Sequence, residues 1–193
     1  MIALRAVATA VLATVARGER SGDQLRRQDR VLAQRPARLG NDERGQAVRC
    51  DVSHPTRLSL KPGVIGLLDA LDDLRLARAI ATSSAHHTVE HHLTAHNLAG
   101  RFHEIVGHGD YASGKPAPDP FLKAAERLGV EPRLCLALED SHNGVRSASS
   151  AGMITIMVPD LLEPTDEIRG LCTFVARDLH EVRSLILGSV PCR

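Results

Sequence analysis

From residue 61 onward, short apolar runs alternate with longer segments in which apolar residues recur at helical spacing. A short apolar run is typical of a strand that is buried on both faces, and the longer segments are typical of helices that bury one face. This alternation predicts an α/β fold, a Rossmann-like parallel sheet with helices on both faces. The predicted strands are residues 77–81, 104–106, 134–138, 153–158 and 173–176, and the predicted helices are 64–71, 86–98, 120–128, 142–151 and 179–187.

Several predicted helices carry boundary residues. Asp119 and Pro120 are the N-cap and first position of one helix, and Gly129 ends it. Ser141 caps the next helix, and Gly152 terminates it. These residues support the predicted boundaries.

The first 60 residues lack the alternation. Residues 1–20 are mildly apolar with no acid before Glu19, which fits a first strand or helix of the domain, or else a targeting segment. Residues 18–55 are rich in Arg, Gln and Asp, so a poorly packed helical segment and a partly disordered one both stay open. We therefore expect an atypical N-terminal segment, residues 1–60, and a core domain, residues 61–193.

Composition narrows the class of protein. A hydrophobic content of 43% in 193 residues is enough to form a core. The first 60 residues hold eleven arginines and six acids, whereas the rest hold 13 basic and 17 acidic residues. We therefore expect no nucleic-acid partner and interpret the basic first part as a solvated surface. The four cysteines show no paired spacing, which favours reduced thiols in a cytoplasmic protein. We also expect a monomer with no membrane partner, since the apolar run near the N-terminus is too short to span a bilayer.

The residues with the clearest chemistry flank the predicted strand 134–138. Lys115 lies just before three alternating prolines, which hold it on an extended loop. Glu139 and Asp140 follow the strand directly, and ligands of open α/β sheets bind outside the carboxyl ends of the strands. An acidic pair beside a lysine on a rigid loop indicates a hard cation next to an anion such as phosphate.

A second candidate is Thr82-Ser83-Ser84, at the end of the predicted strand 77–81. Hydroxyls there, followed by a helix N-terminus, are typical of an anion site, but they also fit a simple capping triplet. Gly109 to Lys115 has the spacing of a phosphate-binding P-loop, yet Pro116 excludes the helix that such a loop requires.

Five histidines lie in the predicted helix 86–98. His87/His91 and His92/His96 are pairs four residues apart, the spacing with which two imidazoles share a zinc or nickel ion. Only Glu90 offers a third ligand nearby in the sequence. We therefore favour a solvated polar face over a metal site.

Residues 61 to about 187 resemble the haloacid dehalogenase superfamily, specifically its β-phosphoglucomutase-like phosphatases. The matching stretches are Lys61-Pro-Gly-Val-Ile-Gly-Leu-Leu, Ile80-Ala-Thr-Ser-Ser, Gly114-Lys-Pro-Ala-Pro-Asp-Pro-Phe, Leu138-Glu-Asp-Ser-His-Asn-Gly and Met157-Val-Pro-Asp. They occur in the family's order with the family's spacing.

The resemblance implies roles for five residues. Thr82 and Ser83 would hold the phosphoryl oxygens, Lys115 would neutralise the phosphate, and Asp140, assisted by Glu139, would bind Mg²⁺. The implied activity is a magnesium-dependent phosphohydrolase or phosphomutase on a small phosphorylated metabolite such as a sugar phosphate. Positioning and charge neutralisation of this kind are what phosphoryl transfer requires.

The family's first motif, Asp-x-Asp-Gly-Thr, is missing from this chain. It normally supplies the aspartyl nucleophile, and the best register places Ala10 and Leu12 on the two aspartates. Asp51 is a poorer alternative, because almost no cap would fit between it and Lys61. Since alanine and leucine can neither attack phosphorus nor bind metal, we expect impaired activity and weak Mg²⁺ binding.

The missing motif leaves alternatives open, namely a non-catalytic relative that binds phosphate and an incomplete chain of an active enzyme. Residues 18–60 stand where the family has its mobile cap, so the cap is reduced or degenerate. We expect residues 3–12 to form the central strand, between 77–81 and 134–138.

Overall fold

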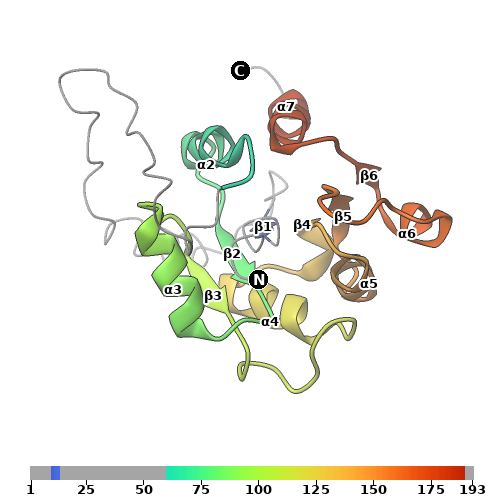
Figure 1. Cartoon of the computed structure of the whole chain (residues 1–193), viewed down its shortest axis with the longest axis horizontal. Helices are drawn as coiled ribbons and strands as arrows, with labels where there is room; N and C mark the ends of the chain where they lie inside the picture. Colours follow the sequence, from blue (N-terminus) through green and yellow to red (C-terminus); the bar gives the residue numbers. More distant parts are fainter. Residues whose placement is uncertain (1–9, 14–59, 190–193) are drawn as a thin grey trace.

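The computed structural model describes residues 10–13 and 60–189, which form a sheet of six strands surrounded by helices (Figure 1). The strands are β1 (Ala10–Ala13), β2 (Arg78–Ala81), β3 (Glu104–Val106), β4 (Cys135–Glu139), β5 (Ile154–Met157) and β6 (Phe174–Val175). The helices are α2 (Val64–Asp73), α3 (His86–Ala95), α4 (Asp119–Leu128), α5 (His142–Ser150), α6 (Asp166–Leu171) and α7 (Leu179–Ser189), with a 3₁₀ turn, η2, at Pro132–Leu134.

The strands lie in the order β3-β2-β1-β4-β5-β6. The pairs β2–β3, β4–β5 and β5–β6 are parallel, as expected of strands connected through helices. Helices pack on both faces, and in Figure 1 α2 and α7 lie above the strands while α4 and α5 lie below them. The predicted α/β class, a Rossmann-like sheet covered on both faces, is confirmed.

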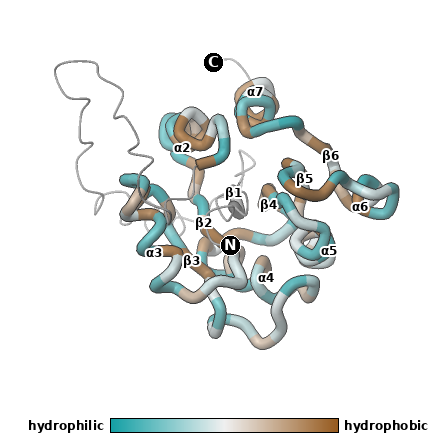
Figure 2. Tube along the Cα trace, in the orientation of Figure 1, coloured by the Kyte–Doolittle hydropathy of each residue, from teal (hydrophilic) through white to brown (hydrophobic). Residues whose placement is uncertain are grey.

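Side chains that alternate along β2 and β4 contribute to different hydrophobic clusters on the two faces of the sheet. Bulky residues of β2 and β4, including Ile80 and Leu138, pack with α2, α3 and α7. Small residues of the same strands, including Ala79 and Ala137, pack with α4 and α5 around Phe121. Figure 2 shows hydrophobic colour at β4 and β5 and alternating colour along the surrounding helices, as expected of helices with one buried face.

The central strand β1 departs from the prediction. It pairs antiparallel with both neighbours, and Ala10 lies opposite Ile80 of β2 and Leu138 of β4. The expected register placed Ala10 and Leu12 at the end of a strand parallel to its neighbours, so the expected direction was wrong. Residues 10–12 of the predicted strand do occupy the central position; the rest of that range, 3–9, lies outside the described residues.

The predicted boundaries agree with the structure to within a few residues, with two instructive differences. Helix α3 ends at Ala95 rather than near Leu98, because Asn97 adopts a left-handed φ of 56° and Leu98 folds back to donate to the Leu93 carbonyl at 2.7 Å. Helix α4 begins at Asp119, with Pro118 as N-cap. The Asp119 carboxylate accepts from the Ser113 N–H at 2.9 Å instead of capping its own helix.

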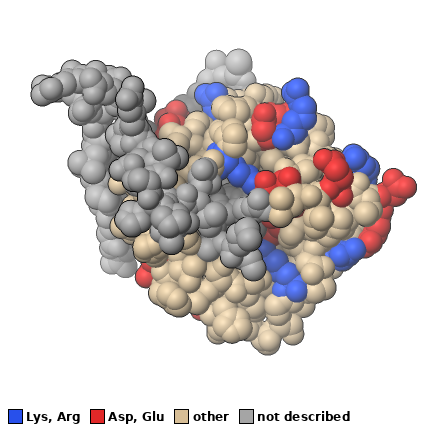
Figure 3. Space-filling view, viewed as in Figure 1, with Lys and Arg blue, Asp and Glu red and all other residues tan. Residues whose placement is uncertain are grey.

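Two short elements, α6 and η2, were not predicted. Within residues 60–189, no helix combines the length and the apolar character needed to cross a membrane. On the face shown in Figure 3, basic and acidic side chains of the described residues are interspersed.

Candidate active site

The predicted site residues converge where β2 and β4 end. Thr82 follows β2, Glu139 is the last residue of β4, and Asp140 follows it. Lys115 reaches this edge from the loop before α4. The site therefore lies at the carboxyl ends of the strands, where open α/β sheets bind ligands.

Glu139 fixes Lys115. The Lys115 Nζ donates to Glu139 Oε1 and to the Ala81 carbonyl at 3.0 Å, and it lies 4.9 Å from the centre of the Phe121 ring. The other Glu139 oxygen accepts from the Asp140 N–H at 3.2 Å and from the Ser141 hydroxyl at 3.1 Å. Glu139 is fully buried, so its carboxylate orients Lys115 and the start of α5 from below the surface.

Gly144 leaves the space that this carboxylate occupies. A Cβ at Gly144 would lie 2.0 Å from the Glu139 carboxyl carbon. The backbone N–H of Gly144 donates to the Ser141 hydroxyl at 3.1 Å, which makes Ser141 the N-cap of α5, as predicted. The spacing Glu-Asp-Ser-x-x-Gly thus lets the first turn of α5 close over a buried acid.

Helix α5 also supports the loop that carries Lys115. The Ser147 hydroxyl donates to the carbonyl of Ala117, and Ser147 is completely buried. Ala117 in turn donates its N–H to the Gly114 carbonyl at 3.0 Å, closing a turn around Lys115. The lysine is therefore positioned by backbone contacts as well as by Glu139.

Asp140 directly follows β4, and its side chain is 16% exposed. Partial burial and the neighbouring Glu139 carboxylate raise the pKa of Asp140 above its ordinary value, against the opposing effect of Lys61. The Lys61 Nζ lies 3.8 Å from Asp140 Oδ2 and 4.0 Å from Asp160 Oδ1. Asp140 thus shares its surroundings with a second carboxylate and a lysine.

Lys61 and Asp160 were not predicted as site residues. Asp160 lies three residues beyond the end of β5, so the rule that ligands bind outside the carboxyl ends of the strands also points to it. Lys61 does not follow a predicted strand, and its position depends on how the neighbouring helix α2 packs against the sheet.

Two hydrogen bonds hold the loop after β2 in place. The Thr82 hydroxyl accepts from the Ser84 N–H at 3.1 Å, and the Thr82 carbonyl accepts from the Tyr111 hydroxyl at 3.1 Å. The capping interpretation was wrong, because the N-cap of α3 is Ala85 and no side chain of the described residues caps this helix. The anion-site interpretation stays a prediction. A hydroxyl that accepts one N–H still carries a proton to donate. Thr82 is buried, whereas Ser83 is exposed.

Asp110 ties this loop to its neighbours. Its carboxylate accepts from the Gly107 N–H at 2.9 Å, lies 2.7 Å from His86 Nε2 and pairs with Arg127 at 2.9 Å. Desolvation alone would raise the pKa of Asp110, but the bonds from Gly107, Arg127 and His86 lower it to about 2. The loops that end β2 and β3 are thereby held together.

A cavity of about 440 Å³ opens beside Ser83 and Lys115. It brings Ser83 and Lys115 together with the first turns of α5; its lining residues are Ser83, Lys115, Ser141, His142, Asn143, Arg146 and Leu162. Arg146 is held by two bonds to Glu167 of α6, at 2.7 and 2.8 Å. Sequence reasoning missed Arg146, because α6 was not predicted.

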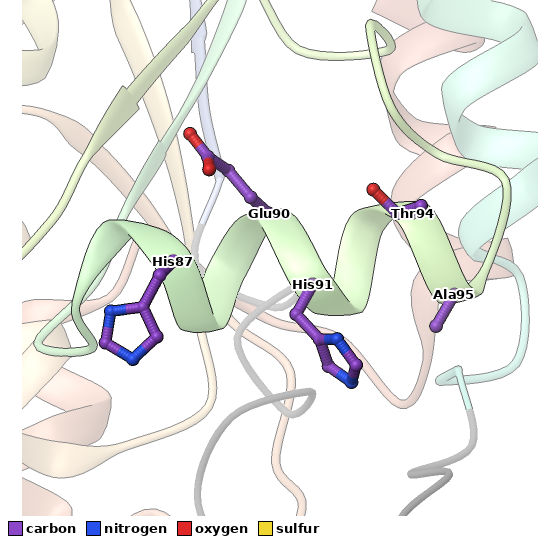
Figure 4. A pocket seen from close by; sticks show the side chains of 5 residues that line it. All are labelled: His87, Glu90, His91, Thr94 and Ala95. Atoms are coloured by element: carbon purple, nitrogen blue, oxygen red, sulfur yellow. The ribbon is translucent and has the colours of Figure 1, made fainter.

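The histidine-rich helix forms a separate hollow (Figure 4). Figure 4 shows His87 and His91 pointing to one side of α3, and Glu90 and Thr94 to the other. Among the described residues, no group of three or more His, Cys, Asp or Glu side chains is arranged to hold a metal ion. The interpretation of the histidines as a solvated polar face stays a prediction.

The donors near Asp140 fit a magnesium ion better than a transition metal. All are oxygens, and Mg²⁺ is usually held by one or two carboxylates together with waters and substrate phosphate. Both Glu139 oxygens already accept hydrogen bonds from Lys115, Asp140 or Ser141. The partly exposed Asp140 carboxylate is therefore the suitable ligand.

The curated proteins that this chain matches are about twice as long as the matched region. The chain is 40% identical over 116 residues to the plasmid protein CbbY of Cupriavidus necator, over 58% of this chain and 46% of that protein. It is 35% identical over 100 residues to hexitol phosphatase B of Escherichia coli K12, over 52% of this chain and 45% of that protein. The chain thus spans about half the length of these relatives.

Solved structures give the same answer for the fold. CbbY of Rhodobacter sphaeroides in complex with phosphate aligns with a TM-score of 0.58 and 29% identity, over 64% of this chain and 56% of that one. A CbbY mutant of the same organism, in complex with xylulose-(1,5)bisphosphate, aligns with a TM-score of 0.60 and 28% identity, over 66% and 57%.

The sequence model of one family, described as haloacid dehalogenase-like hydrolase, matches residues 5–152, which is more than half of the chain. The resemblance inferred from the motifs is thereby confirmed. This chain belongs to the haloacid dehalogenase-like hydrolase family.

Proposed function

We propose that this chain binds a small phosphorylated metabolite, such as a sugar phosphate, at the carboxyl ends of β2 and β4. The observation that carries the proposal is the placement of Lys115, whose ammonium is anchored by Glu139 and Ala81 beside a cavity that Ser83 also lines. A phosphoryl group there would accept from the Lys115 ammonium and from the hydroxyls of Thr82 and Ser83. The names of the relatives, a hexitol phosphatase and CbbY bound to phosphate or to a bisphosphate, support this class of substrate.

The residues have distinct roles in this proposal. Lys115 and Thr82 would hold and neutralise the phosphoryl oxygens, and Asp140 would hold Mg²⁺, with Glu139 orienting Lys115 and the Asp140 backbone. Bound Mg²⁺ would supply further charge neutralisation at the phosphate. We expect its affinity to be weak, because the family's other carboxylate ligand belongs to the missing first motif.

The chemical step is proposed to be impaired, since no carboxylate stands at Ala10 or Leu12. Loss of a covalent nucleophile leaves catalysis by binding and electrostatics, on the order of 10³–10⁴ over water in other hydrolases. The alternative nucleophile, Asp51, lies outside the described residues. A protein that binds phosphate without turnover is the second candidate, favoured by the intact Lys115 anchor beside a central strand that carries no acid.

Calorimetry with inorganic phosphate tests the binding, and an assay with p-nitrophenyl phosphate and sugar phosphates tests the turnover. We expect Lys115→Met to weaken phosphate binding about 10- to 100-fold, the typical value of a charge-assisted hydrogen bond. Lys123→Met is the matched control, because Lys123 lies on α4 and pairs with the exposed Glu126. Equal loss of phosphate affinity in both variants would refute the assigned site.

The assay also separates the two candidates. Robust turnover that disappears in Asp51→Asn would identify Asp51 as the nucleophile and contradict the proposed impairment. Phosphate binding without turnover would support the binding role.

A further inference from the structure

Lys61 lies between two acids at the edge of the sheet. Its Nζ is 3.8 Å from Asp140 Oδ2 and 4.0 Å from Asp160 Oδ1, and it donates to the Val158 carbonyl at 3.3 Å. The three charged side chains are largely shielded from solvent, with exposed fractions of 13%, 16% and 28%. Lys61 lies three residues before α2, Asp140 directly follows β4, and Asp160 lies three residues beyond β5, so the cluster exists only in the folded chain.

The backbone near Lys61 is fixed by packing. Gly63, the N-cap of α2, has a φ of 89°, and a Cβ there would lie 2.9 Å from the His180 backbone nitrogen and 3.0 Å from the Leu179 carbonyl carbon. Such contacts exclude any side chain at this position. The first turns of α2 and α7 therefore meet closely, which holds Lys61 over the two carboxylates.

An exposed lysine near an acid contributes little, because water screens the pair and the long side chain loses entropy. The position of Lys61 differs, since two carboxylates and a carbonyl face one shielded ammonium. Shielding strengthens both the attraction to the carboxylates and the repulsion of any further cation. A divalent ion bound by Asp140 would therefore have to approach against the charge of Lys61.

We infer that Lys61 is the resident counter-ion of Asp140 and Asp160, and that it lowers the affinity of this chain for Mg²⁺. The inference rests on the proposed function, because it takes Asp140 to be the ligand of the ion. It goes further in assigning the weak affinity to a residue inside the cluster as well as to the missing first motif. Lys61 thus lowers cation affinity through its charge beside Asp140 and Asp160.

The size of the effect follows from Coulomb's law. Charges of +1 and +2 about 5 Å apart repel enough to change a binding constant about tenfold even at the dielectric constant of water, and more at a shielded site. We therefore expect Lys61→Met to bind Mg²⁺ at least about tenfold more tightly than the parent chain. Lys61→Gln should do the same while keeping an N–H donor for the Val158 carbonyl.

The experiment is calorimetric titration of Mg²⁺ into the purified full chain, repeated with Mn²⁺. Lys61→Arg is the matched control, because it keeps the positive charge and should leave the affinity of the parent chain unchanged. Circular dichroism and thermal unfolding establish that each variant is folded. If Lys61→Met is unfolded, Lys61→Gln decides the question.

The outcomes separate this inference from the proposed function. Tighter binding in Lys61→Met and Lys61→Gln, unchanged in Lys61→Arg and removed by adding Asp140→Asn, supports both. Unchanged or weaker binding in the neutral variants overturns the role of Lys61, even if Asp140→Asn abolishes binding and so upholds the site. Tighter binding that survives Asp140→Asn places the ion elsewhere and overturns the proposed ligand.

Discussion

The buried pair of Lys115 and Glu139 predicts a specific pattern of stability. Lys115→Met leaves the Glu139 carboxylate, which is fully buried, without its ammonium partner. Glu139→Gln leaves the Lys115 ammonium, on a side chain that is only 10% exposed, with the Ala81 carbonyl and the Phe121 ring. Each change removes one charge of a shielded pair, so the other charge loses its partner in that pair.

The magnitude follows from the burial of both groups. Removing one partner of a buried ion pair typically lowers the free energy of unfolding by about 3–5 kcal/mol, mostly through the unpaired charge that remains. Replacing both partners avoids that term, so the double variant should lose less than the sum of the single losses. We expect a coupling energy of about 1–3 kcal/mol, in the range found for residues in direct contact.

Urea unfolding followed by circular dichroism measures all four members of this cycle. The matched control is the cycle of Lys123→Met and Glu126→Gln on the surface of α4, where the two atoms are 2.9 Å apart but the side chains are 34% and 68% exposed. Exposed pairs of this spacing contribute about 0.2–0.5 kcal/mol. A coupling at Lys115 and Glu139 no larger than at the surface pair would refute the role we assign to Glu139.

Two further predictions concern stability. Gly144→Ala should lower the free energy of unfolding by about 1–3 kcal/mol, because its Cβ would overlap the Glu139 carboxyl group. Gly66→Ala inside α2, where the nearest contact of the new Cβ is 3.8 Å away, should raise it by about 0.5–1 kcal/mol. Thermal unfolding that gives both changes the same sign would contradict this. The pKa of Asp110 is lowered from 3.8 to about 2, so this carboxylate adds about 2 kcal/mol to the free energy of unfolding above about pH 4, and that contribution is lost as the pH falls toward 2. Asp110→Asn should therefore be less stable than the parent chain at pH 7 and should lose less stability on acidification. Urea unfolding that shows the same loss of stability below pH 4 in both proteins would argue against this.

Local patterns were sufficient for most of the fold. The strand from Cys135 to Glu139 and the helix that Ser141 caps follow from an apolar run and a capping residue, because both signals lie within a few positions of each other. The short helix α6 was missed, although Thr165 caps it, since its single buried residue, Ile168, gives no helical period.

The site was predictable to the extent that it depends on strand ends. Lys115, Glu139 and Asp140 were brought together as expected. The sequence alone did not show that Glu139 is buried and orients Lys115 while Asp140 is partly exposed. The burial of Glu139 depends on the space left by Gly144, five residues further along the chain. Lys61 was not predicted because its contacts with Asp140 and Asp160 join positions that lie 79 and 99 residues apart in the chain.

The direction of β1 gives a last prediction, on the restoration of activity. Had the strand run parallel to its neighbours, Ala10→Asp together with Leu12→Asp would have placed two carboxylates at the edge where Lys115 lies. In the antiparallel strand, Ala10 is level with Leu138, while Leu12 is level with Leu136, two residues or about 7 Å further from that edge. We therefore expect the double variant to gain no phosphatase activity on p-nitrophenyl phosphate. Activity that appears in the folded double variant, and disappears when Lys115→Met is added, would show that this strand can present both acids to the site.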